Sequence, residues 1–262
     1  MPFLTHAGVS LRYDRAGSGP AVLFVHGWTC NRTFWERQVV GLRDRFTAIT
    51  VDLRGHGESS RPPKGYGIGA LAGDLEALVR ALGVPRIAIV GWSLGGMVAL
   101  ELARRLGARV SALGLVGTTA GGLGDPANPL AQPQARAELA PRIAADFRGF
   151  IREFAPSLFK AGAASPLLPW ALAQTQKTAP HVAAACFESV FDFDARPFLG
   201  DLRVPTAVLH GRADALFPLA HAEHLAAHIP GARLVVFEES GHAPHLEEPE
   251  AFNAALATLL GG

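Results

Sequence analysis

Short apolar runs recur along the chain, and each is followed by glycine or polar residues that are typical of turns. The runs are nearly continuous in Val, Ile, Leu and Ala, which is the pattern of strands buried on both faces of a parallel sheet. They occupy residues 21–25, 47–51, 86–90, 112–116, 206–209 and 234–237. Helical periodicity lies between them, at residues 71–82, 95–106 and 219–228. This alternation predicts an α/β fold with a doubly wound, mostly parallel sheet.

Two regions depart from the alternation. Residues 3–6 and 10–15 are separated by a short turn and predict an antiparallel hairpin at the edge of the sheet. Residues 120–197 contain no convincing buried strand, and prolines interrupt their helical segments at 142–154 and 182–190. We therefore expect a single domain, with its core at residues 1–119 and 198–262 and a helical cap at residues 120–197 that is inserted late in the sheet.

Composition excludes several classes of protein. The chain has 262 residues, 49% of them hydrophobic and 18% charged, which is enough to bury a core and too apolar for disorder. A net charge of +1 without charged blocks argues against binding nucleic acid or an anionic membrane. Two cysteines cannot form a disulfide framework or a thiolate metal site. With no signal peptide and no long uninterrupted apolar stretch, we expect a soluble, cytoplasmic protein.

The strongest chemical signal is the run Gly-Trp-Ser-Leu-Gly at residues 91–95. It directly follows the strand at 86–90 and opens the helix at 95–106. A sharp turn from strand to helix strains the backbone of its central residue, so the residues two positions away must have almost no side chain. The helix N-terminus also favours negative charge that develops beside it. This context predicts that Ser93 is a nucleophile.

A serine hydroxyl is a weak nucleophile at neutral pH, so it needs a base that an acid orients. His242 follows the last predicted strand, and Asp214 follows the strand at 206–209. All three side chains then lie at the carboxyl ends of parallel strands, where clefts form. Their order along the chain, Ser, Asp, His, is the order that this architecture requires. We therefore predict a catalytic triad of Ser93, Asp214 and His242.

The oxyanion that forms during acyl transfer needs backbone N–H donors. The amide of Leu94 is one candidate, and the amide of Trp28, in the loop after the first buried strand, is the other. We interpret His26 in that loop as a structural residue whose hydrogen bonds fix the loop. Asp52, after the second buried strand, is expected to brace nearby loops, and Cys30 is expected to pack.

These motifs together resemble the α/β-hydrolase superfamily, and the resemblance spans almost the whole chain. It rests on residues 26–28, 52–59, 91–96, 210–214 and 241–242. Residues 91–96 with 26–28 resemble pimeloyl-carrier-protein methyl ester carboxylesterases. Residues 93–98 with 52–59 are equally similar to enol-lactonases and cofactor-free haloperoxidase-like esterases. The resemblance implies a serine hydrolase without a metal or organic cofactor. A serine at position 93 speaks against haloalkane dehalogenases and epoxide hydrolases, which carry Asp there.

The function we expect is hydrolysis of carboxylic esters with small to medium acyl groups, through an acyl-enzyme. A lactonase and a carrier-protein methyl esterase are the alternatives within this chemistry, and a non-catalytic ligand receptor on the same fold is the alternative outside it. Aromatic and aliphatic residues near the predicted triad and in the cap are candidate pocket walls, namely Trp92, Phe154, Trp170, Phe187, Phe191, Leu216 and Phe217. We expect a monomer or weak dimer.

The cap and the helix at 219–228 carry further candidates. Cap arginines at positions 136, 142, 148 and 152 form either an ordinary mixed-charge surface or a docking patch for an acidic acyl carrier protein. Apolar residues at helical spacing in 147–154 are expected to face the core sheet, and some to form the pocket roof. His221, His224 and His228 share a helix face, but the pattern of a zinc protease is absent. We interpret them as a solvated helix face and expect no metal site.

Overall fold

The computed structural model describes residues 2–125, 128 and 130–261, and its centre is an eight-stranded sheet. The strands lie in the order β1-β2-β4-β3-β5-β6-β7-β8. From β3 onward neighbouring strands pair in parallel, whereas β1 and β2 form an antiparallel hairpin at one edge. The bounds are β1 (Phe3–His6), β2 (Val9–Ala16), β3 (Ala21–Val25), β4 (Thr47–Val51), β5 (Ile87–Trp92), β6 (Val110–Val116), β7 (Thr206–Gly211) and β8 (Arg233–Phe237). The predicted fold class and the edge hairpin are confirmed.

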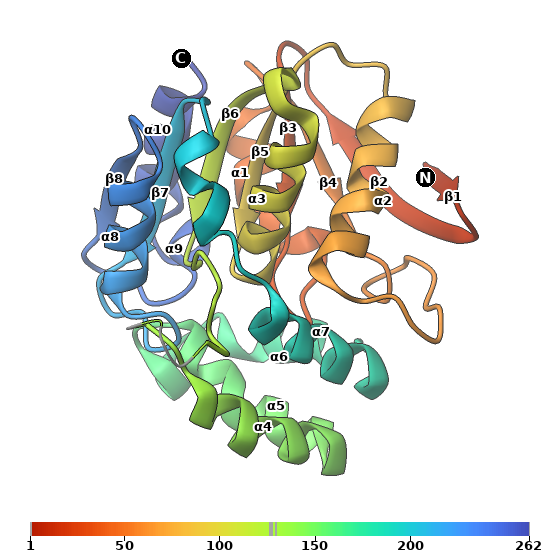
Figure 1. Cartoon of the computed structure of the whole chain (residues 1–262), viewed down its shortest axis with the longest axis vertical. Helices are drawn as coiled ribbons and strands as arrows, with labels where there is room; N and C mark the ends of the chain where they lie inside the picture. The colour runs from red at the N-terminus through yellow and green to blue at the C-terminus, as the bar shows by residue number, and fades with distance from the viewer. Residues whose placement is uncertain (1, 126–127, 129, 262) are drawn as a thin grey trace.

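Helices cover both faces of the sheet, and a separate group of helices lies at one end of it (Figure 1). The α-helices are α1 (Glu36–Leu42), α2 (Ile68–Ala81), α3 (Leu94–Leu106), α4 (Pro133–Ala145), α5 (Phe147–Phe154), α6 (Leu168–Thr175), α7 (Pro180–Asp192), α8 (Leu219–His228), α9 (Pro244–Glu247) and α10 (Pro249–Leu259). Short 3₁₀ turns are η1 (Arg32–Trp35), η2 (Gly107–Arg109), η3 (Ala155–Leu158), η4 (Gly162–Ala164) and η5 (Arg196–Asp201). In the described ranges, no helix has the length and apolar character to cross a membrane.

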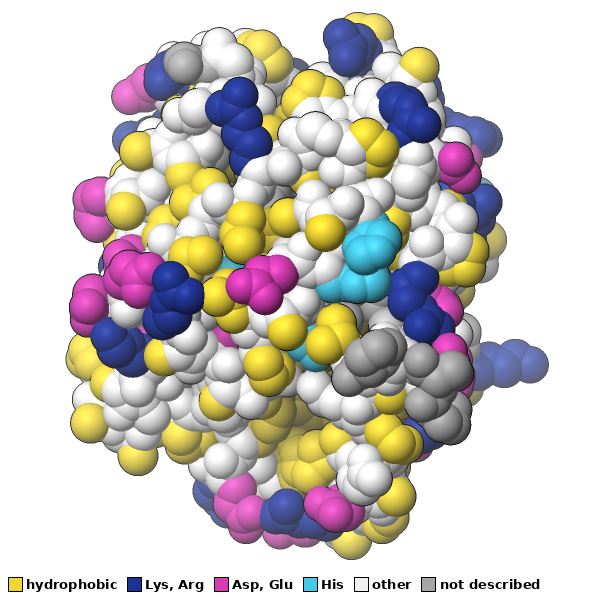
Figure 2. Space-filling view, turned by 60° about the vertical axis from the view of Figure 1, so that its left-hand side comes forward, with side chains coloured by type: hydrophobic (Ala, Val, Ile, Leu, Met, Phe, Trp, Pro, Cys, Tyr) yellow, Lys and Arg dark blue, Asp and Glu magenta, His cyan; other side chains and the backbone are white. Residues whose placement is uncertain are grey.

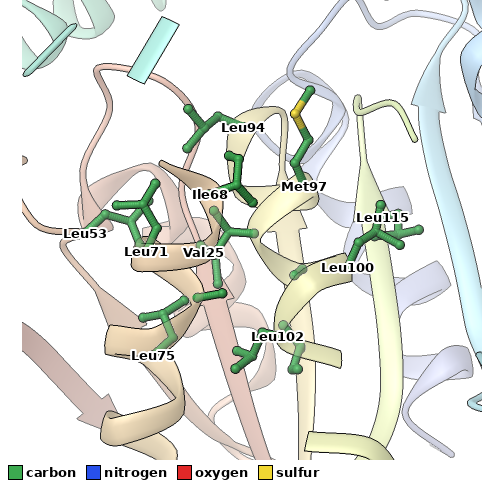
Figure 3. Close-up of a cluster of buried hydrophobic side chains, with 14 of the residues drawn as sticks. Val25, Leu53, Ile68, Leu71, Leu75, Leu94, Met97, Leu100, Leu102 and Leu115 are labelled. Atoms are coloured by element: carbon green, nitrogen blue, oxygen red, sulfur yellow. The ribbon is translucent and has the colours of Figure 1, made fainter. Parts of the chain in front are cut away.

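The alternation of side chains along each strand divides the core into two clusters. Along β3, Leu23 and Val25 join the cluster that includes residues of α2, α3 and α8. Val22 and Phe24 point to the opposite face and join the cluster that includes residues of α1, α9 and α10. Figure 3 shows the first cluster between α2 and α3. Because β3 contributes side chains to both clusters, its sequence is apolar throughout.

The helical insert lies between β6 and β7, as the sequence predicts, and contains α4 to α7. In Figure 1 these helices lie together below the carboxyl ends of the central strands. The sequence prediction of one helix over 142–154 is wrong, because the helix ends at Ala145 and a new one begins at Phe147. Asp146 causes the break, since its Oδ1 accepts a hydrogen bond from the amide of Gly149 and caps α5.

Candidate active site

Ser93 occupies the turn between β5 and α3, with φ 57° and ψ −122°. This is a strained conformation for a residue with a side chain, and such strain is typical of functional turns. A Cβ atom at Gly91 would lie 2.2 Å from the carbonyl oxygen of Gly95, and one at Gly95 would lie 2.4 Å from that of Val25. The Ser93 amide donates to the carbonyl oxygen of Val116 on β6, at 2.9 Å. Both glycines are therefore required for the turn that presents the serine.

Asp214 and His242 meet at the carboxyl ends of β7 and β8. His242 Nδ1 donates to Asp214 Oδ2 at 2.8 Å, and both side chains are buried. Asp214 Oδ1 accepts from the amides of Leu216 and Phe217, at 2.9 and 3.0 Å. Burial would raise the pKa of Asp214, but the interaction with His242 and these hydrogen bonds bring it below its usual range. Asp214 is thus a carboxylate that fixes the Nδ1–H tautomer of His242.

His210, at the end of β7, is a second buried histidine beside this acid. Its Nε2 donates to the carbonyl oxygen of Phe217 at 2.7 Å and lies 3.4 Å from Asp214 Oδ2. Burial lowers the pKa of His210, so the ring is neutral at pH 7. Sequence reasoning missed this residue, although a histidine four residues before the predicted acid was a usable signal. His210 holds the loop that carries Asp214.

Trp92 supports the histidine rather than the pocket. Its Nε1 donates to the carbonyl oxygen of His242 at 2.8 Å, and its ring stacks on Phe34 in the cluster on the far face of the sheet. Trp170 packs on the same phenylalanine, with ring centroids 4.6 Å apart. Neither tryptophan is among the residues that line the cavity next to Ser93. The structure therefore places both predicted wall residues outside this cavity: the pleat turns Trp92, the residue before the serine, to the opposite face, and Trp170 on α6 packs on Phe34.

The candidate oxyanion donors lie on two segments that approach each other at Ser93. Leu94 is the first residue of α3, so its amide has no acceptor within the helix. Trp28 follows Gly27, where a Cβ atom would lie 3.2 Å from the Cβ of Ser93. Trp28, Leu94 and Ser93 line the same cavity. This arrangement leaves the two predicted amides in positions suited to an oxyanion, and their role stays a prediction.

Buried polar residues fix the loops around these donors. His26 Nε2 accepts from the Leu53 amide at 3.0 Å, so its Nδ1 donates to the carbonyl oxygen of Gly27 at 2.8 Å. Burial lowers the pKa of His26 to about 4 and keeps the ring neutral. Asp52 is buried and accepts from the Arg32 amide and guanidinium, at 2.7 and 2.6 Å. The structural roles predicted for His26 and Asp52 are confirmed, and Cys30 is packed in the core.

A small apolar cavity of about 100 Å³ lies between the serine and the insert. It is lined by Trp28, Ser93, Leu94, Met97, Leu123, Gln132, Ala135, Leu139, Phe154, Phe187, Val190, Phe191, Leu216 and Phe217. Five of the predicted wall residues line this cavity, and their contact with a substrate stays a prediction; Met97, Gln132 and the α4 residues among the lining were not predicted. In the space-filling view, hydrophobic side chains line a hollow at the level of the insert, above a row of charged side chains (Figure 2).

Trp28 joins the roof of this cavity to the core. Its Nε1 donates to the carbonyl oxygen of Ala183 in α7, at 2.8 Å. Its ring contacts four phenylalanines of the insert, at positions 147, 150, 154 and 187, with centroids 5.3 to 6.5 Å apart. The insert thus rests on the same residue whose backbone is a candidate oxyanion donor.

The histidines of α8 differ in burial: His221 is buried, His224 is half-buried and His228 is exposed. His221 is 2% exposed, and its Nδ1 shares a hydrogen bond of 2.9 Å with the hydroxyl of Thr119. The interpretation as a solvated helix face is wrong for His221, because a polar partner on another segment allows the ring to be buried. His224 and His228 stack on each other instead, with centroids 4.0 Å apart. Among the described residues, no group of three or more His, Cys, Asp or Glu side chains is placed to hold a metal ion.

The cap arginines form a surface of mixed charge. Arg136 pairs with Glu188 at 2.6 Å and with Asp192 at 3.1 Å, and Arg142 pairs with Glu153. Arg148 and Arg152 are exposed on α5. Exposed ion pairs of this kind contribute little to stability. The arrangement fits the ordinary-surface interpretation, and the docking patch stays a prediction.

Comparisons with known proteins match almost the whole chain. A family model described as the alpha/beta hydrolase fold matches residues 20–249. A pimeloyl-[acyl-carrier protein] methyl ester esterase from Aromatoleum aromaticum is 36% identical over 242 residues, covering 88% of this chain and 94% of that protein. An esterase structure from Exiguobacterium antarcticum has a TM-score of 0.92 at 28% identity and 99% coverage of both chains. An enol-lactonase structure from Burkholderia xenovorans has a TM-score of 0.91 at 25% identity and full coverage of both.

Proposed function

Because the chain belongs to the α/β hydrolase family, we propose that it hydrolyses carboxylic esters with small to medium acyl groups through an acyl-enzyme on Ser93. One observation carries this proposal. The buried Asp214–His242 hydrogen bond of 2.8 Å lies at the same edge of the sheet as the strained Ser93 turn. This placement supports Ser93 as the nucleophile, His242 as its base and Asp214 as the acid that orients the base, the three roles that acyl transfer needs.

The proposed reaction has two halves. Ser93 Oγ attacks the ester carbonyl while His242 Nε2 takes the hydroxyl proton, and the amides of Trp28 and Leu94 hold the oxyanion. The tetrahedral intermediate collapses to the acyl-enzyme, and His242 returns the proton to the departing alcohol. Water then attacks the acyl-enzyme while His242 takes its proton; as the second tetrahedral intermediate collapses, His242 returns the proton to Ser93 Oγ and the acid is released. Asp214 keeps His242 in the useful tautomer throughout.

The cavity supports the proposed size of the acyl group. Its volume of about 100 Å³ is below the several hundred Å³ that are usual for small-molecule sites. Each buried methylene stabilises the bound ester by about 0.8 kcal/mol until the walls are reached. Further methylenes then meet packed aromatic side chains, and the resulting strain offsets the gain. We therefore propose an optimum at about four to eight acyl carbons.

Methyl ester hydrolysis on an acyl carrier protein is the second candidate function. The relative from Aromatoleum aromaticum bears that activity in its name. Exposed Arg148 and Arg152 on α5 would supply positive charge toward an acidic carrier. An enol-lactonase with the same fold also supports cleavage of cyclic esters as a variant of the proposed chemistry.

The test is a parallel assay of p-nitrophenyl esters from acetate to palmitate, simple methyl esters and lactones, with Ser93→Ala as the control. We expect hydrolysis of the short p-nitrophenyl esters, a maximum at the predicted chain length and no turnover by Ser93→Ala. Activity retained by Ser93→Ala would overturn the mechanism. A steady rise through to palmitate would overturn the enclosed pocket and leave the serine mechanism intact.

A further inference from the structure

The loop that carries His242 lies between β8 and α9, and its backbone amides face the carboxylate of Glu247 at the end of α9. Glu247 Oε2 accepts from the Gly241 amide at 2.7 Å. Interaction with the Ala243 amide, on the other side of His242, acts to lower the pKa of Glu247. The side chain of Glu247 therefore binds the backbone directly before the candidate catalytic base.

The second oxygen of the same carboxylate reaches the insert. Glu247 Oε1 accepts from the backbone amide of Lys160, between η3 and η4, at 2.7 Å. The two segments are in close contact here, since a Cβ atom at Gly241 would lie 2.7 Å from the Lys160 nitrogen. Glu247 is thus a bridge of two charge-assisted hydrogen bonds between the insert and the histidine loop.

The environment of Glu247 is unfavourable for a charge, which makes its position informative. Burial, together with the negative charge of Glu248, raises the pKa of Glu247, although the three amides act in the opposite direction. The ammonium of Lys160 is directed elsewhere, to Glu239 Oε2 at 2.7 Å and to the carbonyl oxygen of Glu238. The cost of partly burying this carboxylate is therefore offset by hydrogen bonds from backbone N–H groups of the two segments that it joins.

We propose that Glu247 is a positioning residue, which holds the backbone directly before His242 and couples the position of that histidine to the insert. The inference rests on the proposed function, because it assumes that His242 is the base. In this arrangement the loss of one acceptor frees either the Gly241 side or the Lys160 side, and a base displaced by about 1 Å can cost on the order of 100-fold in rate.

Glu248 provides a matched control in the adjacent position. Its Oε2 accepts from the Glu239 amide at 3.1 Å and from the Ser240 hydroxyl at 2.5 Å. It therefore stabilises the same loop with the same charge, but these two hydrogen bonds lie before Gly241 and do not reach the insert. If the two residues only stabilise the loop, substituting either should have the same effect. If Glu247 positions His242, only the substitution of Glu247 should lower the rate.

The experiment compares Glu247→Gln and Glu248→Gln with the unsubstituted protein, in Tm, in kcat and KM for p-nitrophenyl butyrate, and in the rate of labelling by a fluorophosphonate. We expect similar Tm values for the two variants. In Glu247→Gln, kcat and the labelling rate should fall by about 10- to 100-fold with KM nearly unchanged. Glu248→Gln should stay within about threefold of the unsubstituted protein. Glu247→Asp keeps the charge with a shorter reach and should recover part of the lost kcat.

Equal losses of kcat in the two glutamine variants, or losses that follow Tm, would overturn the positioning role. Unchanged labelling and turnover in Glu247→Gln would overturn it as well. Failure of the proposed function would give a different result. In that case the unsubstituted protein itself would not be labelled at Ser93, and His242 would have no role as a base.

Discussion

The two sides of the candidate site are built from different interactions. At the sheet edge, Ser93, Asp214 and His242 are held by a strained turn and by hydrogen bonds of 2.8 to 3.0 Å. On the insert side, the cavity walls are apolar side chains such as Phe154 and Phe187, and the outer surface carries exposed ion pairs. The first kind of interaction requires fixed geometry, whereas the second requires only shape and apolar area.

This difference assigns separate tasks to the two regions. Reacting groups must stay within a fraction of an ångström of their working geometry, so they belong on a rigid sheet. Apolar walls tolerate substitution at a modest cost, so the choice of substrate can change without disturbing the chemistry. Substitutions at the sheet edge should therefore change the rate for every ester, and those in the insert should change the preference among esters.

The largest expected effect lies in the triad. Ser93→Ala and His242→Ala should each lower kcat by about 10⁴-fold or more for all esters, since triad members act as a unit. Asp214→Asn should lower it by roughly 10⁴-fold, because the amide allows the wrong tautomer of His242; this magnitude follows the serine-protease example. Steady-state assays with circular dichroism as a control for folding check this. A loss confined to long-chain esters would break the division between the two regions.

Acid should weaken the sheet edge before it affects the insert surface. The folded-state pKa of His26 is about 4, against 6.5 for an unperturbed histidine, so the folded state binds fewer protons between these values. The free energy of unfolding that comes from keeping His26 neutral is fully present above pH 6.5, and it is lost as the pH falls toward 4. Urea unfolding should show a loss of roughly 2–3 kcal/mol from this group between pH 7.5 and 4.5.

The matched variants for this experiment are His26→Asn and His181→Asn, since His181 is exposed on α7 of the insert. His26→Asn should be less stable at pH 7.5 but should depend less steeply on pH. His181→Asn should follow the unsubstituted protein at both values. If the two variants show the same pH dependence as the unsubstituted protein, burial of neutral His26 is not a source of acid sensitivity.

Enlarging the cavity from the insert side should change chain-length preference. Phe187→Ala removes a wall residue, so esters with chains beyond about eight carbons should gain roughly tenfold in kcat/KM relative to butyrate. Phe193→Ala, in the same insert but outside the cavity lining, should leave the ratio unchanged. The measurement is kcat/KM across the p-nitrophenyl ester series. A drop in kcat/KM of the same size for all chain lengths would instead indicate that Phe187 supports the catalytic step and does not select the acyl chain.

The smallest expected effect concerns the surface of the insert. If the protein acts on a carrier-bound methyl ester, reversing Arg142, Arg148 and Arg152 to Glu should weaken turnover of that substrate several-fold and leave free esters unaffected. The control reverses exposed arginines near α1, at positions 37, 43 and 45. Equal changes in turnover with both triple variants, or with both kinds of substrate, would show that the cap arginines are an ordinary charged surface and do not dock a carrier.

The sequence predicts the sheet well because a strand buried on both faces leaves a continuous apolar run, as β3 does. Residue order and turn chemistry also place Ser93, Asp214 and His242 at one edge of the sheet. The direction of a side chain is harder to predict. Trp92 adjoins the serine in sequence, yet the pleat directs its ring to the opposite face.

Contacts between distant segments account for the other differences. The burial of His221 depends on Thr119, about one hundred residues away, so helical periodicity alone cannot reveal it. Met97 and Gln132 line the cavity only because the insert folds back over α3. Glu247 shows the same limitation, since its partner Lys160 lies 87 positions earlier in the chain.

The claim that chemistry resides at the sheet edge is tested most directly by labelling the protein with a fluorophosphonate and locating the adduct by peptide mass spectrometry. The structure predicts one phosphonyl group per chain, attached to Ser93, with esterase activity lost in proportion to labelling. Ser93→Ala should take up no label under the same conditions. Labelling at another residue that abolishes activity, or full activity in protein labelled completely at Ser93, would contradict the proposed mechanism.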